Sequence, residues 1–226
     1  MQSKKKTAGA KQTKLSTEQK IIAAAKRVFT IKGYSATRTR DIATEAGINL
    51  ALLNYYFRSK EKLFELIMFE SASRFFLSIK SILNDPSTDL QTKMELLAGH
   101  YTDLLIQEPN FPIFILSEIQ ANPQRLIREL EAIQQLPQSV FMAQLKKELK
   151  KNNNKLHPMH FVINLMSLMV FPYVVKPMMM RMFTRDENHF TTLMMERKNY
   201  IPIWMNGVLS HSEVKPKKAK KHAQMV

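Results

Sequence analysis

Asn54, Tyr55 and Tyr56 stand together in the sequence, and Ser59 and Lys60 follow shortly after them. The chemistry that this cluster offers is non-covalent recognition. A tyrosine has a flat, rigid ring that packs on a sugar or a thymine methyl group, and its hydroxyl hydrogen-bonds to a phosphate. A lysine in the first turn of a helix adds a cation beside free backbone amides, which favours a phosphate. The cluster therefore predicts contact with the backbone of a nucleic acid.

A helix-turn-helix would position these side chains. The segment from Ser16 to Gln19 has the pattern of a capping box and predicts the start of a long first helix, which Gly33 ends. Gly47 separates two short segments, and Asn49 is suited to cap the second, which we expect to end near Phe57. Two short helices packed on a longer one form a helix-turn-helix, whose second helix enters the major groove.

Further local signals complete this unit. A residue between Thr37 and Thr39 would cap the second helix, and Ser59 would cap the fourth, with Glu61 in its first turn. Phe57 should turn inward. The other side chains expected to face the core share helical spacing or lie at the turn: Ile22, Ala25, Val28, Phe29, Ile42, Ala43, Ala46 and Ile48.

The composition indicates an all-α protein. Apolar residues make up 45% of the 226 residues, glycines number only five, and the apolar residues recur at helical spacing. Further helices are expected at about 59–83, 88–107, 113–120, 123–150, 158–183 and 187–209. The most apolar segment, Phe161 to Val175, is too short to span a bilayer and contains Asn164 and Pro172.

The absence of cysteine excludes disulfides and thiolate metal sites and favours a reducing cytoplasm. The charged N-terminus has no apolar segment behind it, so a secretory signal is not expected. We therefore expect a cytoplasmic, nucleoid-associated protein that does not bind a membrane.

The positive charge is unevenly distributed. Net charges are +5 for residues 1–16, +5 for 17–60, +1 for 61–210 and +4 for 211–226. This asymmetry suggests that the N-terminal part meets a polyanion. Two interpretations of the lysine-rich tails stay open, namely contact with a polyanion and simple solubility. We predict four parts: a basic disordered tail (1–16), a DNA-binding domain (17–60), an effector-binding and dimerisation domain (61–210), and a second basic disordered tail (211–226).

Residues 17–66 closely resemble the DNA-binding domain of TetR/AcrR-type bacterial transcriptional regulators. The resemblance lies in three segments at the family's spacing: IIAAAKRVFTIKGY, ATRTRDIATEAGI and YYFRSKEKLFELI. It implies an N-terminal three-helix DNA-binding domain and a C-terminal helical domain for ligand binding and dimerisation. It further implies a homodimer that binds a palindromic operator, most often as a repressor, and leaves it when a small molecule binds.

The resemblance also assigns roles to single residues. The positions that match phosphate and sugar contacts are Thr39, Tyr55, Tyr56 and Lys60. Leu50 and Ala51 match positions that reach bases. The family often has lysine or another polar residue in place of Leu50, and tyrosine in place of Asn54. Because leucine cannot hydrogen-bond to a base, base recognition would depend more on Asn49, Asn54 and Tyr55. Arg38 and Arg40 are candidates for additional backbone contacts.

An alternative is that Tyr55, Tyr56 and Phe57 are core aromatics and that Ser59 and Glu61 form an ordinary cap. The capping box, the Gly47 turn and the local charge of +5 together favour DNA binding.

The C-terminal part is rich in methionine, with ten of the fifteen between Met159 and Met205. Methionine adapts to apolar ligands, but it also fills cores and interfaces. A Cu(I) site at Met178–Met182 is disfavoured because cysteine is absent, and the pair His157 and His160 is weak evidence for a metal. We expect neither metal nor cofactor.

A lipophilic or aromatic effector would bind among aromatic and polar side chains: Phe75, Phe76, His100, Tyr101, Phe111, Phe114, Phe141 and Tyr173. Most of these could instead be core residues. Binding would shift the separation of the two DNA-binding domains. The predicted interface between two copies is an apolar face of the last two helices: Val170, Val174, Met178, Leu193, Met194, Ile201 and Trp204.

Three other functions agree less well with the sequence. A nonspecific architectural DNA-binding protein is the main alternative. An enzyme is not expected, because the sequence has no glycine-rich phosphate loop, nucleophile elbow, metal-ligand cluster or clear carboxylate dyad. A membrane-surface protein is disfavoured because the tails lack the apolar half of an amphipathic anchor.

Overall fold

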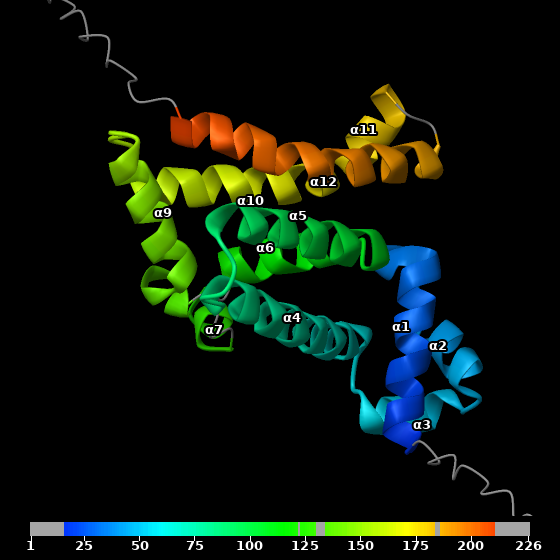
Figure 1. The fold of residues 1–226 in the computed structure, drawn as a ribbon. Helices are drawn as coiled ribbons and strands as arrows, with labels where there is room; N and C mark the ends of the chain where they lie inside the picture. The colour runs from blue at the N-terminus through cyan, green and yellow to red at the C-terminus, as the bar shows by residue number, and fades with distance from the viewer. Residues whose placement is uncertain (1–15, 122, 130–133, 184–185, 211–226) are drawn as a thin grey trace, which may run out of the picture. The chain divides into compact units, whose positions relative to one another are not determined.

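The computed structural model describes residues 16–121, 123–129, 134–183 and 186–210, and every regular element among them is helical. The all-α prediction is confirmed. The elements in chain order are α1 (Thr17–Ala36), α2 (Thr39–Ala46), α3 (Leu50–Tyr56), α4 (Lys60–Asn84), α5 (Leu90–Gln107), α6 (Phe111–Ala121), α7 (Pro123–Glu129), η1 (Leu136–Gln138), α9 (Val140–Lys151), α10 (Pro158–Val174), α11 (Lys176–Met182) and α12 (Glu187–Ser210) (Figure 1).

The chain divides into two compact units, Met1–Glu70 and Ser71–Val226, so the division falls within α4. The expected boundary at residues 60 and 61 lies where α4 begins. The assignment of separate roles to the parts stays a prediction. The predicted tails, residues 1–16 and 211–226, lie outside the described residues except for Ser16.

The first unit begins with the predicted capping box. The Ser16 hydroxyl accepts a hydrogen bond from the Gln19 amide at 3.2 Å, and the Gln19 side chain accepts one from the Ser16 amide at 2.9 Å. Gly33 interrupts α1 with φ of 75°, but helical residues continue to Ala36. On α1, Ala25, Val28 and Phe29 are buried as predicted, whereas Ile22 is only half-buried and the preceding Ile21 is fully buried.

The cap of α2 differs from the prediction. The hydroxyl of Thr37 donates back to the Gly33 carbonyl at 2.7 Å, and it is the Asp41 carboxylate that accepts from the Arg38 amide at 2.9 Å. Ile48 was expected to be a buried plug and is only half-buried. Ile42 and Ala43 are buried as predicted.

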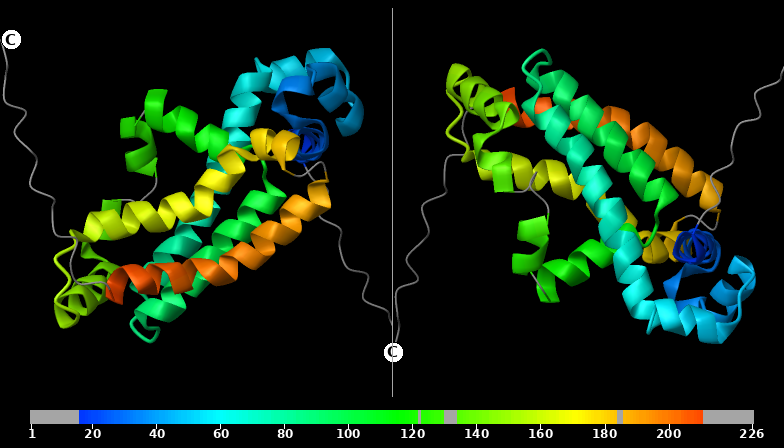
Figure 2. Two further views of the ribbon diagram at one scale, coloured as in Figure 1. Left: turned by 90° about the horizontal axis from the view of Figure 1, so that it is seen from above. Right: turned by 90° about the horizontal axis from the view of Figure 1, so that it is seen from below.

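In the second unit α5 is the central helix. Helix α12 packs along α5, and α10 contacts α5, α6, α9 and α12. Figures 1 and 2 show α5 between α4 on one side and α12 on the other. The core is therefore formed where α5, α10 and α12 meet, with Leu97, Leu165 and Met205 all buried.

Two long helices predicted from the sequence are each broken. The segment 123–150 contains α7, η1 and α9, because Pro137 lies in η1 and Ser139 caps α9 by accepting from the Met142 amide at 3.2 Å. The segment 158–183 bends by 60° between α10 and α11. Pro177 follows the bend in the first turn of α11, where its missing amide costs no hydrogen bond.

Among the described residues, no single helix has the length and apolarity needed to cross a membrane. The bent pair of α10 and α11 meets those criteria only when the two helices are taken together.

The turn between α4 and α5 is built around a buried lysine. Lys93 is fully buried, and its ammonium donates to the Asp85 carbonyl at 2.5 Å and to the Thr88 carbonyl at 2.7 Å and hydroxyl at 2.6 Å. All three of its N–H donors are thus used. Burial lowers the pKa of Lys93, so these bonds must offset the cost of desolvating the charge.

Replacing Lys93 with methionine should lower the free energy of unfolding by about 2 kcal/mol, because the change removes the charged donor that the Asp85 and Thr88 carbonyls share. Urea unfolding followed by circular dichroism would measure this. Lys198→Met is the matched control, since Lys198 is half-buried and on α12. Equal stabilities of the two variants would contradict the role assigned to Lys93.

Candidate nucleic-acid interface

The turn between α2 and α3 is closed by a left-handed glycine. Gly47 has φ of 66°, its amide donates to the Thr44 carbonyl at 3.1 Å, and the Ile48 amide donates to the Ala43 carbonyl at 3.0 Å. These two bonds form a Schellman motif. Asn49 then caps α3 by accepting from the Leu52 amide at 2.8 Å, as predicted. Caps on both sides of the turn fix the direction in which α3 leaves it.

One face of α3 is buried and the other is exposed. Leu53 and Phe57 are buried, so the inward turn predicted for Phe57 is observed. Tyr55 is 81% exposed and Tyr56 is 40% exposed, with their rings edge to face at 5.4 Å. Neither tyrosine is therefore a core residue. Ala51 and Asn54 are exposed as well, whereas Leu50 is half-buried.

Ion pairs in the first unit join the acidic side chains of α2 to basic side chains of α1. Lys32 pairs with Asp41 at 3.1 Å, and Arg27 pairs with Glu45 at 2.7 Å, so both acids of α2 are neutralised by bases of α1. The bond from the Arg38 amide, followed by that from Lys32, lowers the pKa of Asp41. The acids of α2 are thereby held against α1.

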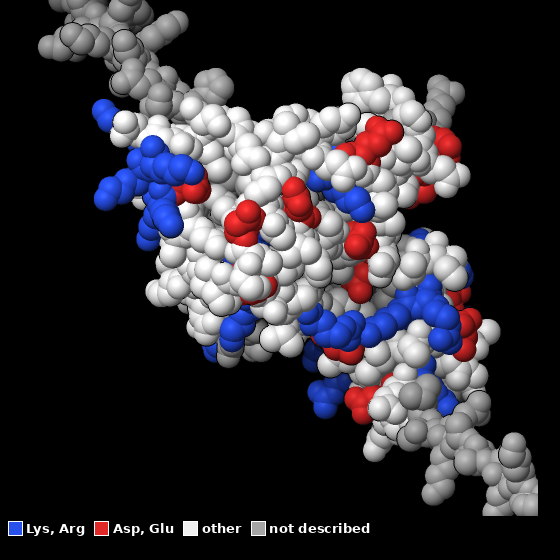
Figure 3. Space-filling model, viewed as in Figure 1, with Lys and Arg blue, Asp and Glu red and all other residues white. Residues whose placement is uncertain are grey.

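The arginines that flank α2 and α3 are left uncompensated. Arg38, Arg40 and Arg58 are exposed, and within the described part of the chain none of them forms an ion pair. In Figure 3, Lys and Arg side chains form a band over the first unit, with a few acidic side chains beside it. Free guanidinium groups near Thr39 and the two tyrosines suit contacts to phosphates.

Lys60 has a different environment from the one expected. Its ammonium donates to the Tyr34 and Thr37 carbonyls, both at 3.1 Å, and lies 4.2 Å from the centre of the Tyr34 ring. Two of its three donors are thus used within the unit. The sequence suggested a phosphate site, whereas the structure shows a side chain that ties α4 to the end of α1.

Tyr34 is the structural residue that the sequence reasoning missed. Its hydroxyl donates to Glu61 at 3.0 Å, and its ring packs on Phe64 at 4.5 Å and on Phe29 at 5.9 Å. Burial, and then the bond to Glu61, raises the pKa of Tyr34 to about 12. The position of Tyr34 directly after Gly33 could have predicted this role, because an aromatic residue that follows a break in a helix can pack back on the core.

The residues expected to line an effector pocket mostly form a packed core. Phe75 contacts Tyr101 at 4.7 Å and Phe111 at 5.8 Å, joining α4, α5 and α6. Most other members of the set are buried or half-buried: Phe76, Phe114, Phe141 and Tyr173. His100 is exposed, and its Nδ1 atom lies 3.0 Å from the Leu96 carbonyl.

The residues expected at an interface between copies divide into two groups. Met194 and Ile201 are buried within the chain itself. Five others are exposed or half-buried: Val170, Val174, Met178, Leu193 and Trp204. A cavity of about 430 Å³ opens beside them and is lined by Phe171, Met179, Leu193, Arg197, Tyr200 and Trp204, among others.

In the described part of the chain there is no group of three or more His, Asp or Glu side chains that could hold a metal ion. The rings of His157 and His160 are 6.4 Å apart, and His157 caps α10 by accepting from the Met159 amide.

The helix-turn-helix geometry agrees with the comparison to known proteins. The family described as "Bacterial regulatory proteins, tetR family" matches residues 21–67, which include α2, α3 and every predicted DNA-contacting residue. Residues 21–67 are therefore a DNA-binding domain of the TetR family. This regulator is 28% identical to the probable HTH-type transcriptional regulator YttP of Bacillus subtilis (strain 168), over 89% of this chain and 98% of that protein.

Two further likenesses concern part of the sequence and the fold. The HTH-type transcriptional repressor NicS of Pseudomonas putida is 29% identical over 45% of this chain and 48% of its own length. The fold of the chain resembles that of the regulator FadR from Bacillus subtilis in complex with stearoyl-CoA, with a TM-score of 0.53, 16% identity, and coverage of 80% of this chain and 96% of that one. The chain is a DNA-binding transcriptional regulator.

Replacing Lys60 with methionine should destabilise the protein by about 1–2 kcal/mol, because the Tyr34 and Thr37 carbonyls lose a charged donor. Urea unfolding is again the measurement. Lys62→Met, two residues further along α4 and exposed, is the control. A residue that acted only on phosphate would leave stability unchanged, and that result would refute the structural role of Lys60.

Proposed function

We propose that the protein is a repressor that binds a palindromic operator as a homodimer and releases it when a small lipophilic effector binds. Residues 17–60 would form the DNA-binding domain, and residues 61–210 would bind the effector and the second copy. The observation that carries this proposal is the exposed face of α3, with two tyrosines and uncompensated arginines beside it, on a turn fixed by Gly47 and Asn49.

The proposed contacts fall into two classes. Thr39, Arg40, Tyr55 and Tyr56 would bind phosphate and sugar, with Lys60 contributing at most its one remaining donor. Asn49, Leu50, Ala51 and Asn54 would meet base edges. The Asn49 side chain already accepts the Leu52 amide, so its amide nitrogen is the part left for a base. The asparagine at position 54, which is exposed, can bond bidentately to adenine.

The second copy would cover an apolar face of α10 and α12. Exposed apolar residues on α10 recur at helical spacing opposite its buried face, at Met159, Ile163 and Met166. On α12 the exposed residues include Leu193, Tyr200, Ile203 and Trp204, and the 430 Å³ cavity lies among several of them. Because Met194 and Ile201 face inward, the interface proposed here uses the outward residues instead. Exposed apolar side chains beside a hollow are typical of a protein–protein interface.

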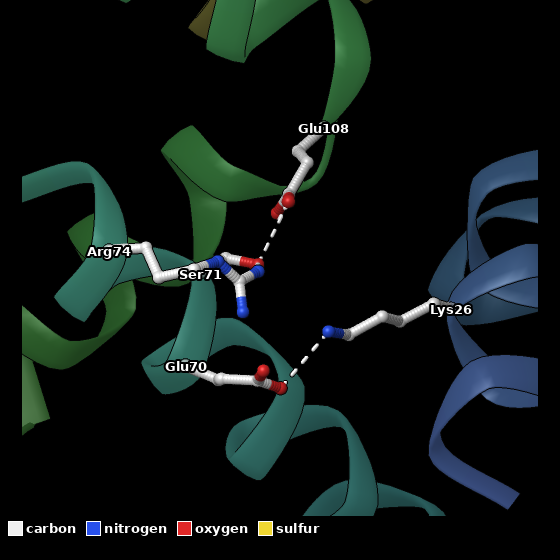
Figure 4. Close-up of polar contacts among 5 residues, drawn as sticks. All are labelled: Lys26, Glu70, Ser71, Arg74 and Glu108. Atoms are coloured by element: carbon white, nitrogen blue, oxygen red, sulfur yellow. Dashed lines mark hydrogen bonds and ion pairs between the residues drawn. The ribbon is translucent and has the colours of Figure 1, made fainter. Parts of the chain in front are cut away.

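The effector would act through α4. The Ser71 hydroxyl donates to Glu108 at 2.8 Å, and Glu70, the preceding residue, pairs with Lys26 of α1 at 3.0 Å (Figure 4). Phe75 is one turn from Ser71 and belongs to the aromatic core of α4, α5 and α6. A lipophilic molecule that entered this core would displace Phe75, disturb the Ser71–Glu108 bond and rotate the helix that carries Glu70. This is a population shift between two arrangements of α4.

The chemistry of the effector is suggested by the apolar core of α4, α5 and α6 and by the buried Glu108 Oε2 atom, which has no hydrogen-bond partner within the described residues. A long-chain acyl compound is the first class to test, since the fold neighbour FadR was solved with stearoyl-CoA.

Replacing both Tyr55 and Tyr56 with phenylalanine should weaken operator binding roughly tenfold, because each hydroxyl contributes about 0.5–1.5 kcal/mol to a phosphate contact. Fluorescence anisotropy with DNA from upstream of the protein's own gene would measure this. Ser81→Ala, which removes an exposed hydroxyl of α4 at a position with no proposed contact, is the control. Adding a long-chain acyl-CoA should release the wild-type protein. Unchanged affinity of the double variant would contradict the DNA-binding mode, and binding of random DNA with equal affinity would favour the architectural alternative.

Replacing Ile203 with glutamate should raise the dimer dissociation constant tenfold or more, on the order of 1.4 kcal/mol, because a charge would be buried between the copies. Sedimentation velocity at micromolar concentration is the measurement. Ile31→Glu introduces the same charge at an exposed apolar position of α1, where no interface is proposed. A wild-type protein that sediments as a monomer would refute the proposed dimer.

A further inference from the structure

The charge of the second unit is concentrated at one end. Residues 61–210 have a net charge of +1, yet residues 140–155 alone carry five lysines and one glutamate, or +4, so the remainder has −3. We call the five lysines the α9 basic surface: Lys146, Lys147, Lys150, Lys151 and Lys155. All five are exposed. Figure 3 shows basic side chains gathered over the region of α9.

Helix stability does not explain this concentration. Lysines in the last turn are favoured by the helix dipole, which accounts for Lys150 and Lys151. Lys146 and Lys147 lie one turn earlier, at positions i and i+4 to them, where like charges repel by a few tenths of a kcal/mol. The one acid in the group, Glu148, pairs with Lys151 at 3.4 Å. The other four lysines make no ion pair with any residue that the structure describes.

The α9 basic surface lies on a helix that is packed on the core of the second unit. The opposite face of α9 is buried through Phe141, Met142, Leu145 and Leu149, and the side-chain amide of Gln144 donates to the Thr88 carbonyl at 2.8 Å. The lysines therefore project from a helix whose position is set by the core.

The same end of the unit carries the C-terminus of α12. The Asn154 side chain donates to the Val208 and Leu209 carbonyls at 2.9 and 3.2 Å, and the Asn152 side chain donates to the Leu209 carbonyl at 3.3 Å. Figures 1 and 2 show the end of α12 beside α9. Five further lysines follow in the sequence after α12, between residues 215 and 221.

We propose that the α9 basic surface is a second, sequence-independent DNA-binding surface, separate from the helix-turn-helix. Lysine is a mobile point charge without the planar fork that reads guanine, so a lysine-only surface suits phosphates rather than bases. No large apolar side chain of α9 is exposed, so the helix has nothing to insert into a lipid bilayer. Duplex DNA is the polyanion that a DNA-binding regulator meets, and it presents one charge about every 1.7 Å along its axis.

The test uses the full-length protein with Lys146, Lys147 and Lys150 replaced by glutamine. The control replaces Arg128, Arg181 and Lys198 by glutamine, which changes the net charge equally at other positions of the second unit. Binding to a short duplex of random sequence is measured by anisotropy across a range of KCl concentrations. The slope of log K against log salt is negative, and each lost phosphate contact reduces its magnitude by about 0.9. The magnitude should therefore fall by about 2–3 in the triple variant and by much less in the control.

A second readout identifies the lysines directly. With wild-type protein, random-sequence DNA should protect Lys146, Lys147 and Lys150 from acetylation, as measured by mass spectrometry, while Lys198 should stay reactive. Circular dichroism confirms that both variants fold. An unchanged salt slope, an equal loss in the control, or acetylation unaffected by DNA would overturn the proposal. So would loss of binding to phosphatidylserine vesicles without any change in DNA binding, which would indicate a membrane surface instead.

Discussion

Helix α3 is seven residues long, and a helix of that length is not stable in water by itself. Its existence depends on groups outside it. Asn49 satisfies an amide at its start, the Phe57 amide donates to Leu53 at its end, and the side chains of Leu53 and Phe57 are buried against the rest of the unit. The residues that face outward contribute nothing to these interactions. They are therefore free to vary with the DNA sequence that is read.

The same unit uses its charges in two ways. Ion pairs between α1 and α2 hold the scaffold together, and they remove both acids of α2 from the face that would meet DNA. Lys60 also stabilises the scaffold, because its bonds to the Tyr34 and Thr37 carbonyls fix the start of α4 at the end of α1. These bonds use no acidic side chain, and the neighbouring arginines keep their charge unpaired. An acid left unpaired on this surface would repel a phosphate, so pairing the acids internally serves stability and binding together.

The features that the sequence predicted well are local. The capping box at Ser16, the glycine at position 47 and the caps at Asn49 and Ser59 depend on residues within three or four positions of each other, and all are observed. The features that it missed depend on partners far along the chain. Lys60 bonds to residues 23 and 26 positions earlier, and Met194 and Ile201 are buried because α12 packs on α5. An apolar helix with residues on several faces does not reveal which face meets its own core and which meets another molecule. The break at η1 was visible in Pro137, but the apolar periodicity on either side of it masked the signal.

Helix α4 makes two contacts with residues far along the chain through two adjacent residues of its own. Its residues 70 and 71 are adjacent, so their side chains point about 100° apart around the helix axis. One of them pairs with α1 and the other bonds to the end of α5, where Glu108 is the C-cap. A rotation of α4 that kept one contact would strain the other, since neither side chain can follow without breaking its bond. A hydrogen bond and an exposed ion pair are each worth only about 1 kcal/mol, which is small enough for a bound ligand to reverse. Two weak contacts on adjacent residues thus leave the position of this helix easy to change, as the proposed effector mechanism requires.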